Sequence, residues 1–321
     1  MEQTKHKSGY LELIAIIAIV LFYGQAAYQR NLVWKDEITL WSDVVKKSPL
    51  KGRPSTNLGT AYSKVKKYKF ALEQYQNALR TGSFPLKAYV NLGNTYEKMG
   101  QLELAFEMYK KALEKTPDDY MARINLGGLL HKQGLTEQAI KEIEIALNIN
   151  PGNLEALNVL GGIYANKGLT NLAIAEYKKI LQIDPDNARA FYNLGLIYDK
   201  KGLTGDAIYY YQQAIRLMPD YPQALSNLGC IYGRTGRIEE AVELFKRSLN
   251  TEPDDATTMF NLGIAYEELA KNYGQRAMNA EQREAMKKAI ETYGRVLIIE
   301  PYNMQARERI NKLMAMSSGA N

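Results

Sequence analysis

A short motif returns at a fixed interval along most of this chain. The tripeptide Asn-Leu-Gly, or a close variant of it, occurs seven times, and consecutive copies are 34 residues apart. The glycines of these copies are Gly59, Gly93, Gly127, Gly161, Gly195, Gly229 and Gly263. A fixed period of this size is typical of a repeat array, in which one small unit stacks on the next and no unit is stable alone.

Each period contains the same sequence of small, large and turn-forming residues. After Leu-Gly comes a tyrosine in most copies, then a turn glycine such as Gly100, and then an Ala, large, Ala series such as Ala105, Tyr109 and Ala112. A proline, here Pro117, ends the unit because it has no N–H to continue a helix. The pattern predicts two antiparallel helices per unit that approach closely at glycine and alanine, with Asp or Asn after the proline capping the next helix.

These residues resemble the tetratricopeptide repeat (TPR) family, in which Leu, Gly and Tyr mark the first helix and Ala, an aromatic residue and Ala mark the second. The resemblance implies an all-α fold, a right-handed TPR superhelix (α-solenoid) of about seven helix-turn-helix repeats, and a role in protein–protein interaction. The seven repeats expected on this basis are residues 52–85, 86–119, 120–153, 154–187, 188–221, 222–255 and 256–303.

The seventh repeat is longer than the others. The interval from Gly263 to Ala289 exceeds the equivalent interval of the other repeats, such as Gly93 to Ala105. The excess is roughly 14 residues, or four turns of helix. Two more turns in each helix would lengthen the hairpin without rotating its buried faces. We expect residues 270–285 to form this protruding tip, and residues 304–321 to form a capping helix with a frayed tail.

The N-terminal segment has a different character. Residues 1–10 are polar, and residues 11–30 are largely apolar, with Glu12 as the one charge from Leu11 to Tyr28. Eighteen residues of helix span roughly 27 Å, close to the hydrocarbon thickness of a bilayer. We therefore expect a transmembrane helix; a cleaved signal peptide and a buried soluble helix are the alternatives. Lys5 and Lys7 are offset by Arg30 and Lys35, so local charge does not decide the orientation.

Residues 31–51 predict half of a further repeat. Trp34, Ile38, Trp41 and Val45 have helical spacing. Pro49 lies 34 residues before Ser83, so this helix is in register with the second helices of the later repeats. We expect the array to begin directly after the apolar segment.

The segment around this half-repeat carries a second resemblance. An apolar span followed by Arg-Asn-x-x-Trp-x-Asp-Glu-x-x-Leu-Trp and then TPRs is similar to the C-terminal part of transmembrane-and-TPR proteins, some of which are O-mannosyltransferases. The catalytic membrane portion of such proteins has no counterpart here. The resemblance implies an extracytoplasmic array and a link to protein or envelope modification, not transferase activity.

Composition narrows the functional classes. One cysteine excludes an intramolecular disulfide and a cysteine-based zinc site, and the two histidines, His6 and His131, are far apart. The net charge of +6 is spread out, without a basic block for nucleic acid. No phosphate loop or catalytic triad is evident. We expect no enzymatic activity, no metal, no cofactor, no nucleic acid and no small-molecule substrate.

The candidate site is the concave groove that the first helices line in TPR proteins. The resemblance places these residues there: Asn57, Lys64, Lys87, Asn91, Asn94, Lys98, Asn125, Lys132, Asn158, Arg189, Asn193, Lys200, Asn227, Arg234 and Asn261. An asparagine beside the buried Leu-Gly pair has no packing reason to recur, and its amide can both donate to and accept from a peptide backbone. The alternative is that each asparagine bonds to the backbone of a neighbouring repeat.

The sequence therefore predicts a membrane-anchored, single-pass TPR scaffold that binds extended peptide segments, with its repeats in an extracytoplasmic, periplasmic location. Two alternatives stay open: an accessory subunit that presents substrates to a membrane glycosyltransferase, and an assembly factor that faces the cytoplasm.

Overall fold

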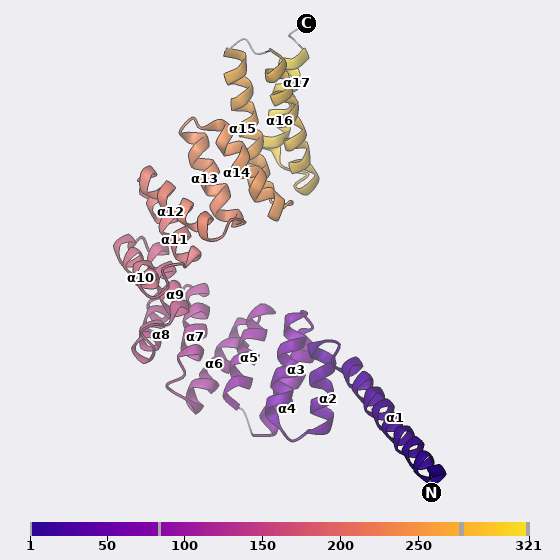
Figure 1. The fold of residues 1–321 in the computed structure, drawn as a ribbon. Coiled ribbons are helices and arrows are strands. Elements are labelled where there is room, and N and C mark those ends of the chain that lie inside the picture. Colours follow the sequence, from indigo (N-terminus) through magenta and orange to yellow (C-terminus); the bar gives the residue numbers. More distant parts are fainter. Residues whose placement is uncertain (1, 83–84, 276–278, 319–321) are drawn as a thin grey trace. The chain divides into compact units, whose positions relative to one another are not determined.

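The computed structural model describes residues 2–82, 85–275 and 279–318, and every helix or strand within these ranges is an α-helix (Figure 1). The chain divides into two compact units, residues 1–156 and 157–321. The predicted all-α architecture is thus confirmed. The helices before the division are α1 (Glu2–Val33), α2 (Glu37–Lys47), α3 (Gly52–Lys64), α4 (Tyr68–Arg80), α5 (Pro85–Lys98), α6 (Leu102–Lys115), α7 (Tyr120–Lys132) and α8 (Thr136–Ile149).

The division falls within α9 (Leu154–Asn166), and the second unit continues with helices of the same alternating kind. They are α10 (Thr170–Ile183), α11 (Ala188–Lys200), α12 (Thr204–Leu217), α13 (Pro222–Arg234), α14 (Ile238–Thr251), α15 (Ala256–Gln275), α16 (Asn279–Ile299) and α17 (Met304–Ser318). We number the repeats from one (α3 and α4) to seven (α15 and α16), and call the two helices of each repeat its first and second helix.

The glycine of each Asn-Leu-Gly copy sits where the two helices of a repeat approach most closely. A Cβ atom built on Gly93 would lie 2.4 Å from Cε1 of Tyr109, and one on Gly229 would lie 2.8 Å from Cε1 of Phe245. No real side chain tolerates such contacts, so glycine is required there. Tyr109 is fully buried, which confirms that the recurring aromatic residue fills the space beside the glycine.

In repeats one to six, the turn between the two helices has one residue in the left-handed region. Gly100, Gly134, Gly168, Gly202 and Gly236 have φ angles from 71° to 82°. Repeat one has Lys66 in this region instead, at φ 58°. Glycine adopts this conformation without a Cβ clash, which explains why the turn position is glycine in so many repeats.

Polar residues after the turn between repeats cap several of the first helices. The Asp119 side chain accepts a hydrogen bond from Ala122 N at 2.6 Å, and that of Asn187 accepts one from Ala190 N at 3.0 Å. Each cap satisfies one of the backbone N–H groups that a helix leaves open at its start. The predicted capping role of these residues is confirmed.

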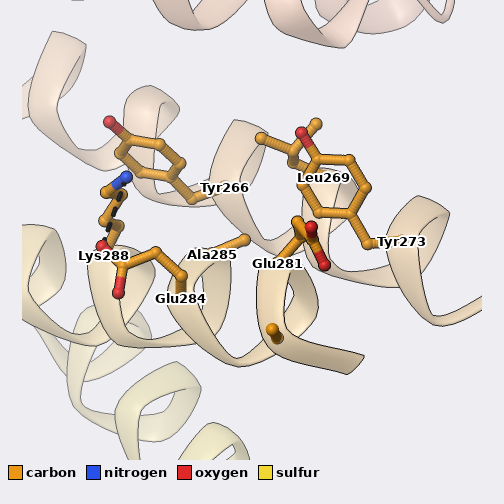
Figure 2. Close-up of a pocket in the computed structure, with 8 residues that line it drawn as sticks. Tyr266, Leu269, Tyr273, Glu281, Glu284, Ala285 and Lys288 are labelled. Carbon is orange, nitrogen blue, oxygen red and sulfur yellow. Dashed lines mark ion pairs between the residues drawn. The ribbon is translucent and has the colours of Figure 1, made fainter. Parts of the chain in front are cut away.

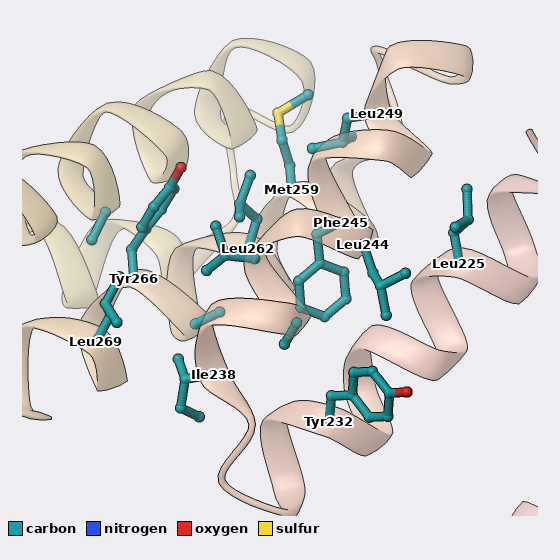
Figure 3. Close-up of a cluster of buried hydrophobic side chains, with 14 of the residues drawn as sticks. Leu225, Tyr232, Ile238, Leu244, Phe245, Leu249, Met259, Leu262, Tyr266 and Leu269 are labelled. Carbon is teal, nitrogen blue, oxygen red and sulfur yellow. The ribbon is translucent and has the colours of Figure 1, made fainter. Parts of the chain in front are cut away.

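The core of the second unit shows how neighbouring repeats share their buried surface. Side chains of α13, α14 and α15 belong to one buried cluster. Among them, Leu228, Phe245 and Met259 are at most 3 % exposed. Figure 3 shows Phe245 and Leu262 within this cluster. Because each repeat contributes part of one continuous core, its stability depends on its neighbours.

Repeat seven distributes its extra residues equally. α15 has 20 residues and α16 has 21, against 13 in α13 and 14 in α14, so each helix is seven residues longer. Two added turns keep the inner face in place: Ala285, Met286 and Ala289 are buried. The central part of the predicted tip, residues 276–278, lies outside the described residues.

The N-terminal apolar segment belongs to the long helix α1, in which the side chains of residues 16–29 are exposed. Within the described part of the chain, we find no helix that has both the length and the apolar character needed to cross a membrane. The transmembrane helix expected at residues 11–30 is therefore not supported. Tyr23, Gln25, Tyr28 and Gln29 make the second half of that segment less apolar than its first half.

The predicted half-repeat is the helix α2. Asp36 caps it in a capping box with Thr39, accepting from Thr39 N at 2.8 Å. α2 packs against α3, the first helix of repeat one. It therefore takes the place that a second helix of a preceding repeat would occupy.

Candidate functional site

In the first unit, five predicted residues line one groove. The groove has a volume of about 450 Å³. It is bordered by Asn57 on α3, by Lys87, Asn91 and Asn94 on α5, and by Asn125 on α7. Its size is within the range of about 300–1,000 Å³ usual for ligand sites. All five come from first helices, because the 34-residue period returns each position to the same face.

The asparagine amides in this groove differ in whether they form hydrogen bonds within the chain. Asn91 Nδ2 donates to Thr60 Oγ1 at 3.4 Å, and Asn94 Oδ1 accepts from the Tyr109 hydroxyl at 2.6 Å. Asn57 and Asn125 are half-buried, and their side chains make no hydrogen bond to any residue that the structure describes. These two amides therefore keep all of their donors and acceptors for a ligand or for water.

The asparagines of the second unit are used between repeats. Asn193 Nδ2 donates to Asn158 Oδ1 at 2.9 Å, and Asn227 Nδ2 donates to the Tyr192 hydroxyl at 3.4 Å. In each case the acceptor is a side chain on the first helix of the preceding repeat. The alternative expected from sequence named the neighbouring backbone as the partner; these amides reach side chains instead.

Three of the predicted groove cations are neutralised within the chain. Lys64 pairs with Glu37 at 2.7 Å, Lys132 with Glu97 at 2.5 Å and Arg234 with Asp199 at 2.6 Å. Each acid lies on the preceding helical unit, 27 to 35 residues earlier. The other four cations, Lys87, Lys98, Arg189 and Lys200, are exposed and form no ion pair with a described residue.

Two acids, Glu97 and Glu267, each accept a hydrogen bond from a buried tyrosine of their own repeat. Glu97 accepts from the Tyr109 hydroxyl at 3.1 Å while it pairs with Lys132. Glu267 accepts from the Tyr293 hydroxyl at 2.9 Å while it pairs with Arg309 at 2.8 Å. We call this arrangement of acid, tyrosine and following cation a polar clasp. Burial raises the pKa of Tyr109, and the adjacent Glu97 charge raises it further, so the hydroxyl stays protonated.

Two further pockets are lined mainly by residues that the sequence did not single out. One, of about 320 Å³, lies in the lengthened hairpin between Tyr266, Leu269 and Tyr273 of α15 and the α16 residues Glu281 to Lys288 (Figure 2). Its Glu284 and Lys288 form an ion pair at 3.3 Å. The other, of about 360 Å³, lies between α13, α14 and α15 beside Asn261 and Arg234.

Comparisons with known proteins give the repeats their family. Sequence models described as "Tetratricopeptide repeat" match residues 86–119, 108–141, 188–221 and 222–255, and one described as "TPR repeat" matches residues 161–202. These stretches are tetratricopeptide repeats. The matches at residues 86–119, 188–221 and 222–255 each coincide with one helical hairpin of the structure, and the other two run across the junction between neighbouring hairpins. No curated protein matches the chain in sequence.

Solved structures share the TPR fold. PilF of Pseudomonas aeruginosa is 20 % identical, with a TM-score of 0.58 over 72 % of this chain and 97 % of its own. The APC/C hetero-tetramer Cut9–Hcn1 is 19 % identical, with a TM-score of 0.61 over 70 % of this chain and 45 % of its own. At these identities the likeness concerns the fold alone. The expected resemblance to transmembrane O-mannosyltransferase-like proteins is not supported by these comparisons.

The sequence analysis did not predict the pocket beside Asn261, because this pocket depends on the absence of an acid and of a tyrosine hydroxyl at two positions of repeat six. Repeat six has Gly233 where repeats two and seven have Glu97 and Glu267, and Phe245 where they have the clasped tyrosine. Comparing the repeats column by column would have shown both departures. In the part of the chain that the structure describes, no group of three or more His, Cys, Asp or Glu residues could hold a metal ion.

Proposed function

We propose that this chain is a TPR scaffold that mediates protein–protein interaction by binding an extended peptide segment along the first helices of repeats one to three. The observation that carries this proposal is the pair of half-buried amides, Asn57 and Asn125, which have no hydrogen-bond partner among the described residues and line one groove with Asn91 and Asn94. Half-buried polar groups without partners favour a ligand that supplies them.

The chemistry of the groove suits a peptide backbone. An asparagine side chain offers two N–H donors and a carbonyl acceptor, which matches the C=O and N–H groups of an extended chain. Asn57 and Asn125 stand two periods of the repeat apart, so they contact different parts of the same ligand. Backbone pairing of this kind depends little on the side chains of the ligand.

The positive charge of Lys87 favours a peptide with an acidic residue. Lys87 lines the same groove, is exposed and forms no ion pair with a described residue. An exposed pair contributes modestly, about 0–1 kcal/mol, so an acidic ligand residue near Lys87 would improve binding without being essential.

The location of the repeats in the cell stays a prediction from the sequence. An extracytoplasmic, membrane-associated array predicts that the chain stays with membranes after carbonate washing and that added protease digests the repeats of intact spheroplasts. Protection of the repeats, while a known periplasmic domain is digested, would instead favour the alternative of an assembly factor that faces the cytoplasm.

The binding proposal is tested with peptides selected by the full chain from a phage-displayed library of random peptides. We expect the double substitution Asn57→Ala, Asn125→Ala to weaken the binding of selected peptides about tenfold to thirtyfold, since each lost hydrogen bond is worth about 1 kcal/mol. Its melting temperature should match that of the unmodified chain, because neither amide has a partner in the described part of the fold.

The matched control is Asn193→Ala, which removes an amide that bonds to Asn158 of the preceding repeat. It should lower the melting temperature and leave peptides selected on repeats one to three bound as before. Equal affinity for the unmodified chain and the double variant would contradict the proposal.

A further inference from the structure

The second unit contains an apolar pocket on the first helices of repeats six and seven. Its volume is about 360 Å³. Gly229, Cys230 and Gly233 of α13 form one side, Ile264 and Ala265 of α15 form the other, and Phe245 of α14 lies at its base. Figure 3 shows Phe245 in the core between these helices.

The two glycines of this pocket have different roles, although they are one helical turn apart. A Cβ on Gly229 would lie 2.8 Å from the Phe245 ring, so this glycine is required for packing. A Cβ on Gly233 would meet no atom within 4 Å. The absence of a side chain at Gly233 is therefore not imposed by the fold, and it leaves the pocket open.

Comparison with repeat two at equivalent positions shows which side chains repeat six lacks. Gly233 and Phe245 stand four periods of the repeat after Glu97 and Tyr109, which form a polar clasp with Lys132. The corresponding position for the cation holds Glu268. Repeat six thus lacks the acid, the hydroxyl and the cation together, so the space that a polar clasp fills elsewhere is apolar here.

The charges at the rim of the pocket are already compensated. Arg234 pairs with Asp199 at 2.6 Å, and Glu268 pairs with Lys271 at 2.5 Å. The Cys230 thiol accepts from Asn261 Nδ2 at 3.4 Å, and burial raises its pKa, so it is uncharged near neutral pH. A charged group entering this pocket would lose its hydration without gaining an unpaired partner.

We propose that this pocket takes one uncharged apolar side chain, aliphatic or aromatic, of the peptide that the TPR array binds. The inference rests on the proposed function and adds a specificity element to it: the amide-lined groove accepts a backbone, whereas this pocket selects a residue. Asn261 lies at its edge and has one amide N–H and its carbonyl oxygen left for the backbone beside that residue.

The pocket can be probed without any peptide, because Cys230 is the single cysteine of the chain. The experiment measures how fast Cys230 reacts with benzyl methanethiosulfonate and with the anionic 2-sulfonatoethyl methanethiosulfonate. Each rate is divided by the rate of the same reagent with the urea-unfolded chain, which removes the difference in intrinsic reactivity. We expect the benzyl reagent to be favoured at least tenfold, and Gly233→Leu, which fills the pocket, to remove the preference. Equal rates, no reaction with either reagent, or a preference that persists in the variant would overturn the proposal.

The peptide test compares the full chain with Gly233→Leu and with the control Gly294→Leu. Gly294 lies within α16, and a Cβ built there also meets nothing within 4 Å. Peptides selected by the unmodified chain should share one apolar position, and Gly233→Leu should bind them at least tenfold more weakly while Gly294→Leu binds them normally. Ile264→Ala enlarges the pocket and should shift the selected residue toward larger side chains, which provides a second readout if Gly233→Leu disturbs the fold.

The outcomes separate the two proposals. Selected peptides that lack an apolar position, or that Gly233→Leu binds equally well, would overturn the pocket as a specificity element and leave the proposed function intact. Failure of the unmodified chain to select any peptide would overturn both.

Discussion

The groove of the first unit and the pocket of the second are built from the same positions of the TPR, yet they offer different chemistry. Asn57 and Asn125 present amides without partners among the described residues, beside the exposed Lys87. In the second unit, Asn193, Asn227 and Asn261 donate to the preceding repeat, and an apolar pocket opens beside Asn261. One unit can pair with a backbone, and the other can receive a side chain.

The difference shows which positions of the repeat are free to specialise. The glycine that faces the second helix cannot change, since Gly93 and Gly229 both lie against an aromatic ring. The residue four positions later can change, because it points toward the next repeat: it is Glu97 in a polar clasp and Gly233 beside the pocket. Packing positions therefore fix the fold, and neighbouring positions set the character of each surface.

The largest expected effect tests this distinction within one helix. Gly229→Ala places a methyl group against the Phe245 ring, and such overpacking should lower the free energy of unfolding by about 2–3 kcal/mol. Gly233→Ala meets open space and replaces a helical glycine, which should raise it by about 0.5–1 kcal/mol. Urea unfolding followed by circular dichroism measures both. Similar effects of the two substitutions would show that these glycines are equivalent.

Much of this fold follows from the sequence, because its causes are local and periodic. The 34-residue period, the turn glycines and the Ala-Tyr-Ala series predict the helical hairpins, and the two turns added to each helix of repeat seven follow from the geometry of the helix. The partners of the groove residues do not follow. Lys132 reaches Glu97 and Asn193 reaches Asn158, each 35 residues away, and only the stacking of repeats brings them together.

At the N-terminal segment, the sequence predicted a membrane-spanning helix that the structure does not support. A largely apolar stretch suggested a membrane span, although Gln25 and Gln29 lie in its second half. Length alone is a weak criterion when polar residues interrupt the stretch. The open space at Gly233 was equally hidden, because the surroundings of a glycine are set by tertiary neighbours.

A smaller effect is expected at alkaline pH, because repeat four has a buried tyrosine, Tyr177, where repeat six has Phe245. Burial raises the pKa of Tyr177, which is only 4 % exposed, from 10.0 to about 12. Below pH 10 the hydroxyl is neutral in both the folded and the unfolded chain. Between pH 10 and 12 it ionises in the unfolded chain alone, so this residue should remove about 2 kcal/mol from the free energy of unfolding across that range.

The measurement is urea unfolding at pH 9 and pH 12 for the unmodified chain and for Tyr177→Phe. The variant should lose less stability over this interval, because phenylalanine has no proton to release. Tyr302→Phe, at a position 91 % exposed, is the matched control and should behave like the unmodified chain. A pH dependence that is the same in all three proteins would show that burial of Tyr177 does not couple its ionisation to folding.

The smallest effect concerns the missing polar clasp itself. Glu268 occupies the position from which a cation would pair with an acid at 233, so Gly233→Glu should bring two carboxylates together and have a free energy of unfolding about 0.5 kcal/mol lower than that of Gly233→Ala. Glu268→Lys alone removes the pairing with Lys271 at a similar, small cost.

Combined, the two substitutions recreate the acid and cation that Glu97 and Lys132 provide, and a double-mutant cycle should give a favourable coupling of about 0.5–1 kcal/mol. The combined variant should also fill the pocket and lose the preference of Cys230 for an apolar reagent. Additive effects of the two substitutions would mean that repeat six cannot be returned to the geometry of repeat two, and that its pocket arises from the backbone and not from the residues that repeat six lacks.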